Sequence, residues 1–324
     1  MRNLKDLNEY HVGNTPLYHA KSYCPSQNLY LKLEMLNPLG SIKDRTAYYI
    51  LKNLIDTGRL TSDIKIVESS SGNLGLALNY FACDIGIYFR CLIDPTVPQE
   101  KQKQLEDADI DVYVVALDDN PDYRTARIQL AKELNQQKDW IWTNQYNNPA
   151  NVQAHYETTG PEIWLQTRGS VDYVVCSVGT GGTICGIGRY LKQQNFSIKI
   201  IAVEPDGSTA FGGQPGKYLS VGSGMRGQSG IFKLYGHVVD YYCKVKDLDA
   251  LQECVNFFSA ENISIGVTTG SVLVVASCIA LRYPKSKIVV IAPDDGEKYF
   301  DLFEGISPDK HHCDDVILHP YVNK

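Results

Sequence analysis

Several features that would assign a protein to a class at once are missing from this sequence of 324 residues. No uninterrupted apolar run approaches the roughly 18 residues that span a bilayer, and the N-terminus MRNLKDLNEYHV lacks the apolar core of a signal peptide. There is no Lys/Arg-rich run, and the net charge is −6. These absences argue against a membrane protein, an exported protein and a nucleic-acid partner, so we expect a cytoplasmic protein.

Cysteine pairs of the CxxC kind are also missing. The nine cysteines are an odd number, and most lie inside apolar runs such as DYVVCSV and VLVVASCIA. This placement predicts buried free thiols in a reducing cytosol. The cluster His311-His312-Cys313 has the chemistry of metal ligands, but it lies in a polar tail with no matching half elsewhere. We therefore expect a solvated tail and no metal site.

What the sequence does contain is an alternation of two kinds of segment. Short runs of β-branched and aromatic residues, typical of strands, occur at 29–34, 65–69, 87–94, 111–117, 172–178, 199–205, 237–245 and 287–293. Segments of helical period lie between them, at 44–58, 73–86, 98–109, 122–137, 181–194, 248–262 and 270–283. The alternation predicts an α/β fold with parallel sheets covered by helices on both faces. The length predicts two domains, or one large unit with a lobe.

Two stretches show no clean period. The stretch 142–164, WTNQYNNPANVQAHYETTGPEIW, is crowded with Asn, Gln, Tyr and Thr, and we interpret it as a link between two α/β lobes that passes close to a ligand. The stretch 204–230 is rich in glycine. Loops of that length in compact domains are usually functional or disordered, and the interspersed Phe211, Tyr218 and Met225 favour a functional loop.

Three predicted strand-to-helix junctions are rich in Gly, Ser or Thr. The first is SSSGN (69–73), which has more hydroxyls than the single one that a helix cap needs. The second is GTGGT (179–183), and the third is TTGS (268–271), for which plain capping is an equal explanation. Backbone N–H groups and hydroxyls at a helix start bind anions, so the first two junctions predict anion or phosphate sites.

The second junction also resembles part of a dinucleotide-binding fold, because Glu204 ends the next strand about where a ribose-binding carboxylate would fall. A GxGxxG fingerprint that starts at Gly179 would need glycine at position 184, where Ile184 stands. We therefore favour a phosphate site that is not a nicotinamide site.

One ligand would use all three junctions together with a lysine, such as Lys43 in NPLGSIKDR: the phosphorylated aromatic aldehyde pyridoxal phosphate (PLP). The motifs GNTPL, KLEMLNPLGSIKDR, ESSSGNLGLAL, NQYNNPANVQAHYETTGPEIW, GTGGTICGIGR, AVEP, GVTTGS and DDGEKY follow one another in order. In this series the sequence resembles the fold-type II PLP enzymes, specifically the cysteine synthase/cystathionine β-synthase group. The resemblance covers nearly the whole chain, from about Gly13 to Tyr299.

This resemblance implies a fold and a cofactor site. The implied fold has two lobes, each with a mostly parallel sheet flanked by helices, and the cofactor lies in the cleft between them. Residues 1–40 plus 147–324 would form the larger, phosphate-binding lobe, and 41–146 the smaller, mobile, substrate-clasping lobe. The implied cofactor-binding residues are Lys43, Asn73, Gly179, Thr180, Gly181, Gly182, Thr183 and Thr268. Lys43 would be the Schiff-base lysine, and the Thr268 hydroxyl would face the pyridine nitrogen, which suits β-elimination.

A reaction and a set of substrate contacts are implied as well. An O-activated L-serine would displace Lys43 from the aldimine, and Lys43 would take the Cα proton. The β-substituent would leave to give α-aminoacrylate, and a second nucleophile would add at Cβ. The residues expected to contact substrates are Ser70, Ser71, Asn73, Gln145, Tyr146 and Arg226. The implied oligomer is a homodimer.

Departures from the sulfhydrylase pattern narrow the choice within the group. Leu74 stands where a hydroxyl usually follows the asparagine, the third junction reads TTGS, and the C-terminal motif reads PDDGEKYFDLF. Together these look like the siderophore-precursor branch. Its enzymes join O-phospho-L-serine to L-glutamate, making N-(2-amino-2-carboxyethyl)-L-glutamate on the route to 2,3-diaminopropionate. Arg226 falls where that branch also carries arginine, and its guanidinium would pair with phosphate or carboxylate unless it is a solvated loop cation.

Other functions remain open at this point. GTGGT and NPANVQAHYETTGPEIW are typical of sulfhydrylases, so cysteine synthesis from O-acetyl- or O-phosphoserine is the alternative. A PLP-binding protein without catalytic activity is a further alternative, which the retention of Lys43, Asn73 and Gln145 disfavours. The sequence does not decide the second nucleophile, the leaving group or the oligomeric state.

Overall fold

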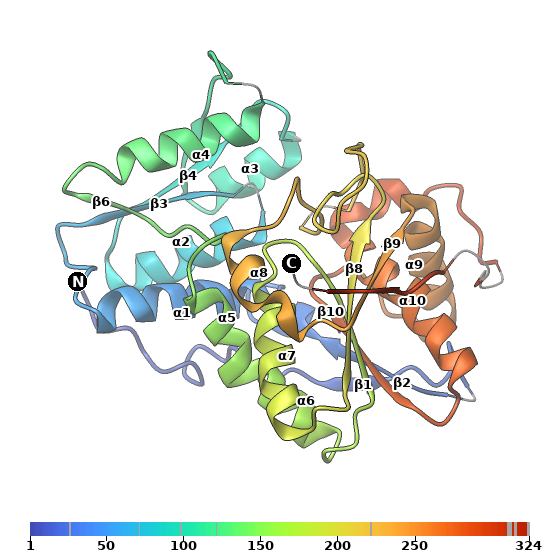
Figure 1. Ribbon diagram of the computed structural model, residues 1–324. Coiled ribbons are helices and arrows are strands. Elements are labelled where there is room, and N and C mark those ends of the chain that lie inside the picture. The colour runs from blue at the N-terminus through green and yellow to red at the C-terminus, as the bar shows by residue number, and fades with distance from the viewer. Residues whose placement is uncertain are drawn as a thin grey trace. The chain divides into compact units, whose positions relative to one another are not determined.

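The computed structural model describes residues 1–322 apart from 26, 71, 98, 121, 221, 310–312 and 314–315. The chain divides into two compact units (Figure 1). Unit 1 comprises Met1–Val12 and Lys43–Asn151, and unit 2 comprises Gly13–Ile42 and Val152–Lys324. Within the described ranges, no helix combines the length and the apolar character needed to cross a membrane.

Unit 1 is built on a four-stranded parallel sheet with the strand order β5-β4-β3-β6. Its strands are β3 (Lys65–Ser69), β4 (Phe89–Ile93), β5 (Asp111–Val114) and β6 (Trp140–Trp142), of which Figure 1 labels β3, β4 and β6. Its helices are α1 (Lys43–Asp56), α2 (Asn73–Ile85), α3 (Gln99–Asp107) and α4 (Tyr123–Leu134). Helix α4 packs on one face of the sheet through a cluster that includes Val67, Leu92 and Ala126. Helices α1 and α2 pack against each other.

Unit 2 is built on a seven-stranded mixed sheet with the order β1-β2-β10-β7-β8-β9-β11 (Figure 1). Its strands are β1 (Leu17–His19), β2 (Asn28–Leu33), β7 (Tyr173–Ser177), β8 (Lys199–Pro205), β9 (Tyr241–Val245), β10 (Lys287–Ala292) and β11 (His319–Pro320). The five central strands pair in parallel, and β1 and β11 add antiparallel edges.

Helices cover both faces of this sheet. They are α5 (Ala150–Ala154, whose last three residues belong to this unit), α6 (Gly160–Gln166), α7 (Gly182–Gln194), α8 (Gly230–Tyr235), α9 (Asp247–Glu261) and α10 (Val267–Arg282). Successive strand residues point to opposite faces: Val174 packs with α7 and α8, and Val175 packs with α9 and α10. Both faces are therefore apolar, which is why these strands read as continuous hydrophobic runs. The predicted α/β class with two helix-flanked sheets is confirmed.

The stretch 142–164 contains a boundary between the two units, between Asn151 and Val152, as a link would, but its second half is helical, which the sequence did not indicate. Helix α5, a π-helical segment (His155–Thr159) and α6 follow one another there. Buried polar side chains hide this from the sequence: Thr158 and Thr159 face the interior, and the Thr158 hydroxyl donates to the carbonyl of Ala154. The π-helical turn also shifts the register, so no 3.6-residue apolar period survives.

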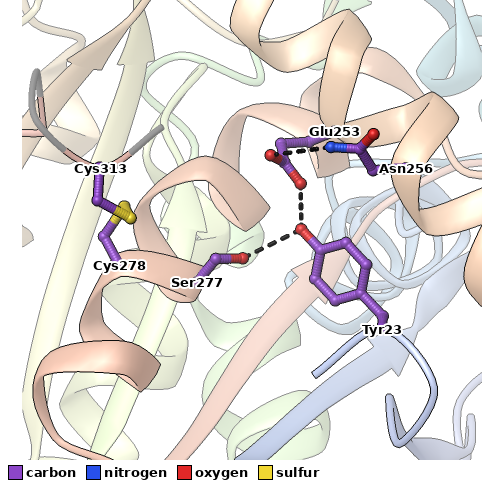
Figure 2. The surroundings of a disulfide bond; sticks show 6 residues. All are labelled: Tyr23, Glu253, Asn256, Ser277, Cys278 and Cys313. Atoms are coloured by element: carbon purple, nitrogen blue, oxygen red, sulfur yellow. Dashed lines mark hydrogen bonds between the residues drawn. A yellow bond between two sulfur atoms is a disulfide. The ribbon is translucent and has the colours of Figure 1, made fainter. Parts of the chain in front are cut away.

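The expectation of buried free thiols is wrong for three cysteines. Cys278 and Cys313 form a disulfide with a Cα–Cα distance of 5.4 Å (Figure 2), and Cys83 is exposed. The other six cysteines are free and buried. The bonded pair is 35 residues apart, so nothing local in the sequence indicates it. Cys313 is thus a disulfide partner, whereas His311 and His312 lie outside the described residues.

Candidate active site

The first Ser-rich junction lies in unit 1, between the end of β3 at Ser69 and the start of α2 at Asn73. Ser70 is buried, and its hydroxyl accepts a hydrogen bond from the backbone N–H of Gly75 at 3.2 Å. Asn73 is half-buried in the first turn of α2. The predicted substrate residue Ser71 lies outside the described residues. The described part of this turn therefore presents a hydroxyl and an amide at a helix N-terminus, where an anion is stabilised.

A chain of hydrogen bonds connects this junction to the helix that begins at Lys43. The Gln145 side chain donates to the carbonyl of Ser69 at 3.4 Å, and the Asn151 amide donates to the carbonyl of Gln145 at 2.9 Å. The Thr46 hydroxyl donates to Asn151 Oδ1 at 3.3 Å. Thr46 lies about one turn beyond Lys43, which is the half-buried first residue of α1. Unit 1 thus brings together the predicted residues that flank β3, β6 and α1.

A buried carboxylate fixes this end of the sheet. Glu68 is fully buried, and its two oxygens accept four hydrogen bonds. The donors are Ser69 N at 2.8 Å, Trp142 Nε1 at 3.2 Å, Thr143 Oγ1 at 2.6 Å and Gln145 N at 3.1 Å. Burial raises the pKa of Glu68 from its ordinary value of 4.5, and the four donors oppose that shift. Glu68 therefore holds in place the backbone of both Ser69 and Gln145.

An arginine accompanies the predicted substrate residue Tyr146. The guanidinium carbon of Arg124 lies 5.0 Å from the centroid of the Tyr146 ring, within the range of a cation–π contact. Arg124 and Tyr146 are both half-buried. A guanidinium in this position has the geometry to pair with a carboxylate or a phosphate.

The glycine-rich junction of unit 2 has a backbone that side chains would obstruct. It links the end of β7 at Ser177 to the start of α7 at Gly182. Gly181 has a φ of +87°, and a Cβ there would lie 2.7 Å from the Phe232 ring. A Cβ on Gly179 would lie 2.6 Å from the carbonyl oxygen of Gly222. Helix α7 runs for 13 residues from this junction, and the N-terminus of a helix of that length stabilises an anion.

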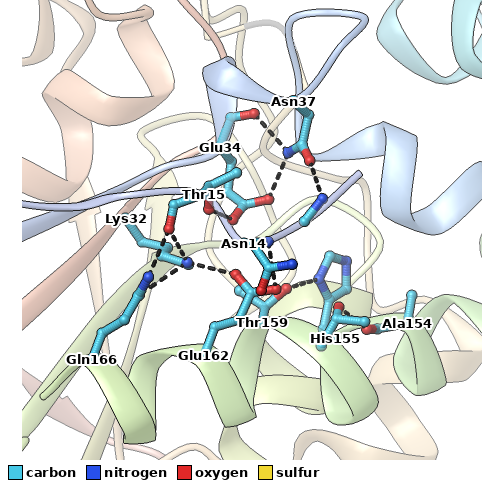
Figure 3. A network of polar contacts seen from close by, with 12 residues as sticks. Asn14, Thr15, Lys32, Glu34, Asn37, Ala154, His155, Thr159, Glu162 and Gln166 are labelled. Atoms are coloured by element: carbon cyan, nitrogen blue, oxygen red, sulfur yellow. Dashed lines mark hydrogen bonds and ion pairs between the residues drawn. The ribbon is translucent and has the colours of Figure 1, made fainter. Parts of the chain in front are cut away.

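The hydroxyls of this junction are held by specific partners. The Ser229 hydroxyl donates to the carbonyl of Thr180 at 2.5 Å. Thr183 Oγ1 lies 3.3 Å from Nε2 of His155, a fully buried histidine whose Nδ1 lies 2.9 Å from Thr159 Oγ1 (Figure 3). Because both ring nitrogens are engaged, the histidine fixes the orientation of the Thr183 hydroxyl.

The turn that precedes Lys43 is fixed by hydrogen bonds within unit 2. Asn37 Nδ2 donates to the carbonyl of Glu34 at 2.8 Å, a contact drawn in Figure 3. The N–H of Ile42 donates to the carbonyl of Pro293, just beyond β10, at 2.9 Å. Ile42 is the last residue of its segment in unit 2, and Lys43 is the first residue of the next segment of unit 1. The candidate lysine therefore follows directly on an anchored turn.

The third junction and the long loop also meet within unit 2. Thr268 is buried in the first turn of α10, and its hydroxyl lies 3.2 Å from that of Ser220. The Ser220 hydroxyl also lies 2.8 Å from that of Ser223. Gly224 N donates to the carbonyl of Val178 at 2.7 Å, which attaches the loop to the end of β7. Arg226, in the same loop, is exposed.

Glu204, which ends β8 where a ribose-binding carboxylate would fall, has a structural role. It is fully buried, and it accepts hydrogen bonds from the Ser208 hydroxyl and from the backbone N–H of Ala210 at 3.0 Å. It also pairs with Lys244 at 3.1 Å. Its oxygens are therefore used to anchor the long loop. In the described part of the chain, no group of three His, Cys, Asp or Glu side chains is arranged to hold a metal ion.

Sequence reasoning missed Arg124, His155 and Ser220. His155 and Ser220 carried a weak signal, because each lies in a stretch already interpreted as functional. Arg124 carried none, since YRTARIQLAKEL reads as an ordinary amphipathic helix.

Comparison with known proteins agrees with this geometry. Residues 9–294 match the family model described as pyridoxal-phosphate dependent enzyme. The O-acetyl serine sulfhydrylase isoform 3 of Entamoeba histolytica is 30% identical, with a TM-score of 0.85 and coverage of 96% of this chain and 94% of that one. The O-acetylserine dependent cystathionine beta-synthase of Helicobacter pylori is 28% identical, with a TM-score of 0.82 and coverage of 93% and 98%. An O-ureido-L-serine synthase is 27% identical, with a TM-score of 0.84 and coverage of 92% and 95%. The chain belongs to the pyridoxal-phosphate dependent enzymes, in the β-replacement group of the cysteine synthases and cystathionine β-synthases.

Proposed function

We propose that this enzyme joins O-phospho-L-serine to L-glutamate by β-replacement. The product is N-(2-amino-2-carboxyethyl)-L-glutamate, on the route to 2,3-diaminopropionate and siderophores. One observation supports substrates with an anionic group besides the carboxylate of the activated serine, as O-phospho-L-serine and L-glutamate both have: the Arg124 guanidinium over the ring of Tyr146, the residue after Gln145. Arginine binds carboxylates and phosphates through paired hydrogen bonds, and a sulfide nucleophile has neither group.

The proposed phosphate site is the β7–α7 junction. Residues 179–183 would hold the phosphate, because two glycines leave room where a Cβ would collide and the helix start offers N–H donors. The family resemblance implies that Asn73 would contact the ring hydroxyl and that Thr268 would face the ring nitrogen. When bound, PLP supplies an electron sink for the bond broken at the substrate Cα.

Lys43 is the base in the proposed reaction. It carries the cofactor and takes the proton from the substrate Cα. The amine must be neutral to accept that proton, which suits its half-buried position in the first turn of α1. The anchored turn before it limits where the amine can go.

Ser70, Ser71, Asn73 and Gln145 bind the carboxylate of the O-activated serine in this proposal. Leu74, which replaces the usual hydroxyl, is buried and offers no donor. The substrate carboxylate therefore has one hydrogen-bond donor fewer. We propose that cationic side chains make up for this donor in binding the substrates: Arg124, with Tyr146 beside it, and Arg226 in the long loop.

The deciding experiment compares both nucleophiles with both activated serines and identifies the products by mass spectrometry. We expect glutamate to be consumed with O-phospho-L-serine faster than sulfide is. Arg124→Met should raise the KM for glutamate or O-phosphoserine by about tenfold, the effect of one charge-assisted hydrogen bond. Arg59→Met, at an exposed position of the same unit, is the matched control.

Lys43→Ala separates this mechanism from PLP binding without catalysis. We expect the variant to fold and to lose turnover. Retention of β-replacement at the wild-type rate would contradict the role given to Lys43.

Cysteine synthesis is the second candidate function, favoured by the 30% identity to the Entamoeba sulfhydrylase. Formation of cysteine alone in the product assay would establish it in place of the glutamate reaction. We also propose, from the family resemblance, a cytoplasmic homodimer. Light scattering and cell fractionation test these two points.

A further inference from the structure

The C-terminal segment of unit 2 reaches across one edge of the seven-stranded sheet. Cys313 forms a disulfide with Cys278 of α10 (Figure 2). Helix α10 covers the same face of the sheet as α9. Val316 and Leu318 pack on that same face. The segment then pairs with β9 as β11, and Tyr321 packs with the cluster on the opposite face. The tail thus connects the two faces of the sheet.

Tyr321 contacts the elements that support the glycine-rich junction. Its ring centroid lies 5.7 Å from that of Phe232 and 5.4 Å from that of Phe211. Its hydroxyl accepts a hydrogen bond from Gln228 Nε2 at 3.1 Å, and its N–H donates to the carbonyl of Asp240 at 2.9 Å. These contacts hold Tyr321 against both the long loop and α8.

Helix α8 touches the junction directly through two residues. The Phe232 ring lies where a Cβ on Gly181 would be, at 2.7 Å, so ring and glycine backbone are in close contact. Ser229 caps α8 by accepting from Phe232 N at 2.9 Å while its hydroxyl donates to the carbonyl of Thr180. A displacement of Phe232 therefore changes the position of the backbone N–H groups at the start of α7.

The described residues of the tail combine packed and exposed positions: Val316 and Leu318 pack on the core, and His319 stacks on Tyr242 at 5.1 Å. Strand β11 pairs with β9 over only two residues, and Ile317 and Val322 are 59% and 76% exposed. Ile317 and His319 also line a pocket of about 260 Å³, so these two residues are not closely packed on that side. The disulfide adds a covalent attachment to these noncovalent contacts of the tail.

We propose that the C-terminal segment is a thiol-controlled clamp on the cofactor loop, with Tyr321 as its positioning residue. A dithiol reductant donates two electrons and two protons to the Cys278–Cys313 bond. The products are two cysteine thiols and an oxidised, cyclic disulfide of the reductant. The freed tail then holds Phe232 less firmly, and the loop binds PLP more weakly. This inference rests on the proposed assignment of residues 179–183 to the cofactor phosphate.

The test measures the dissociation constant of PLP for the full-length protein before and after dithiothreitol, together with kcat at saturating PLP. Mass spectrometry of alkylated peptides counts the free thiols. We expect reduction to raise the dissociation constant by about fivefold or more, a typical coupling between distant sites, with kcat at saturation unchanged. Cys313→Ser should show the weaker binding from the start and no response to reductant.

Substitutions of the tail separate positioning from a general loss of structure. In the oxidised protein, Tyr321→Ala should weaken PLP binding to the level of the reduced protein. Tyr321→Phe, which keeps the ring, should restore most of it. Val322→Ala, at the exposed next position, should bind PLP like the wild type. Cys83→Ser, which removes the exposed free thiol, should respond to reductant like the wild type.

Three outcomes would overturn the proposal. Alkylation of both Cys278 and Cys313 in protein purified in air would show that the disulfide does not form. Unchanged PLP binding after complete reduction would show that the thiols do not control binding. Unchanged PLP binding in Tyr321→Ala would show that the tail does not act as a clamp. Gly181→Ala separates a failure of the clamp from a failure of the phosphate-site assignment. If this variant binds PLP as the wild type does, the assignment of residues 179–183 to the cofactor phosphate has failed. If Gly181→Ala weakens binding and the tail variants do not, only the clamp has failed.

Discussion

We expect the substitution Glu68→Gln to destabilise unit 1, because Glu68 accepts hydrogen bonds from the backbone of both Ser69 and Gln145. One oxygen of Glu68 accepts from Ser69 N and Trp142 Nε1, and the other accepts from Thr143 Oγ1 and Gln145 N. A glutamine amide must turn its NH₂ group toward one of these pairs. In either orientation it faces a backbone N–H that cannot rotate to become an acceptor.

The expected cost follows from that count. At least one buried N–H loses its acceptor, and the remaining hydrogen bonds lose their charge assistance, which together cost roughly 3–5 kcal/mol. Removing a buried charge offsets about 1 kcal/mol of this. We therefore expect Glu68→Gln to lower the free energy of unfolding of unit 1 by about 2–4 kcal/mol.

Urea denaturation followed by tryptophan fluorescence measures this cost. Trp140 and Trp142 lie in unit 1, so a Trp164→Phe background restricts the signal to that unit. Glu133→Gln, at an exposed position of α4, is the matched control and should change the stability by less than about 0.5 kcal/mol. A Glu68→Gln loss as small as that of the control would show that the four hydrogen bonds do not stabilise the unit.

The difference in unfolding free energy between the wild type and Glu68→Gln should also depend on pH, in a direction that the pKa of Glu68 fixes. The pKa of Glu68 is raised in the folded state, so the folded protein binds this proton more tightly than the unfolded chain. Its contribution to stability is present at low pH and is lost as the pH rises through the raised pKa. The stability gap between wild type and Glu68→Gln should therefore widen as the pH falls from about 7 toward 4.5, the ordinary glutamate value. A gap that narrows over this range would contradict the direction of the shift.

Two further predictions concern packing and thiol reactivity. Gly270→Ala would place a Cβ 2.0 Å from the carbonyl oxygen of Ala250, so thermal denaturation should show a loss of about 3 kcal/mol. Gly86→Ala, at a φ of +73° with open space around it, should lose only about 1 kcal/mol, and equal losses would contradict the clash. Burial raises the pKa of Cys243 to about 11, so mass-spectrometric mapping after brief alkylation at about pH 8 should find exposed Cys83 modified first.

Elements with two apolar faces could be predicted well from the sequence. The runs at 65–69 and 199–205 coincide with β3 and β8, because buried parallel strands are hydrophobic throughout and end at polar or glycine-rich turns. Strands β1, β6 and β11 escaped notice because two or three residues give no measurable alternation. The run 237–245 begins with a 3-10 turn over Gly236–Val238, and only Tyr241–Val245 pairs as β9.

Side chains that meet only through tertiary structure could not be predicted. The glycine-rich junction is visible in the sequence because its residues are adjacent and belong to a recognisable strand–turn–helix pattern. By contrast, Arg124 meets Tyr146 across 22 positions, and Cys278 meets Cys313 across 35. Such pairings depend on the docking of whole helices and tails, for which a single sequence carries no local signal.

The order of strands in the larger sheet has a consequence for synthesis on the ribosome. Strand β2 pairs with β10 over residues 287–292, so residues 28–33 have no parallel partner on the β10 side until residues 287–292 have been made. Unit 1, in contrast, contains no residue beyond Asn151 and is complete while more than half of the chain remains to be made. We therefore expect unit 1 to fold first during translation. Strand β2 would meanwhile stay unpaired on its β10 side, which makes it a site of aggregation during synthesis.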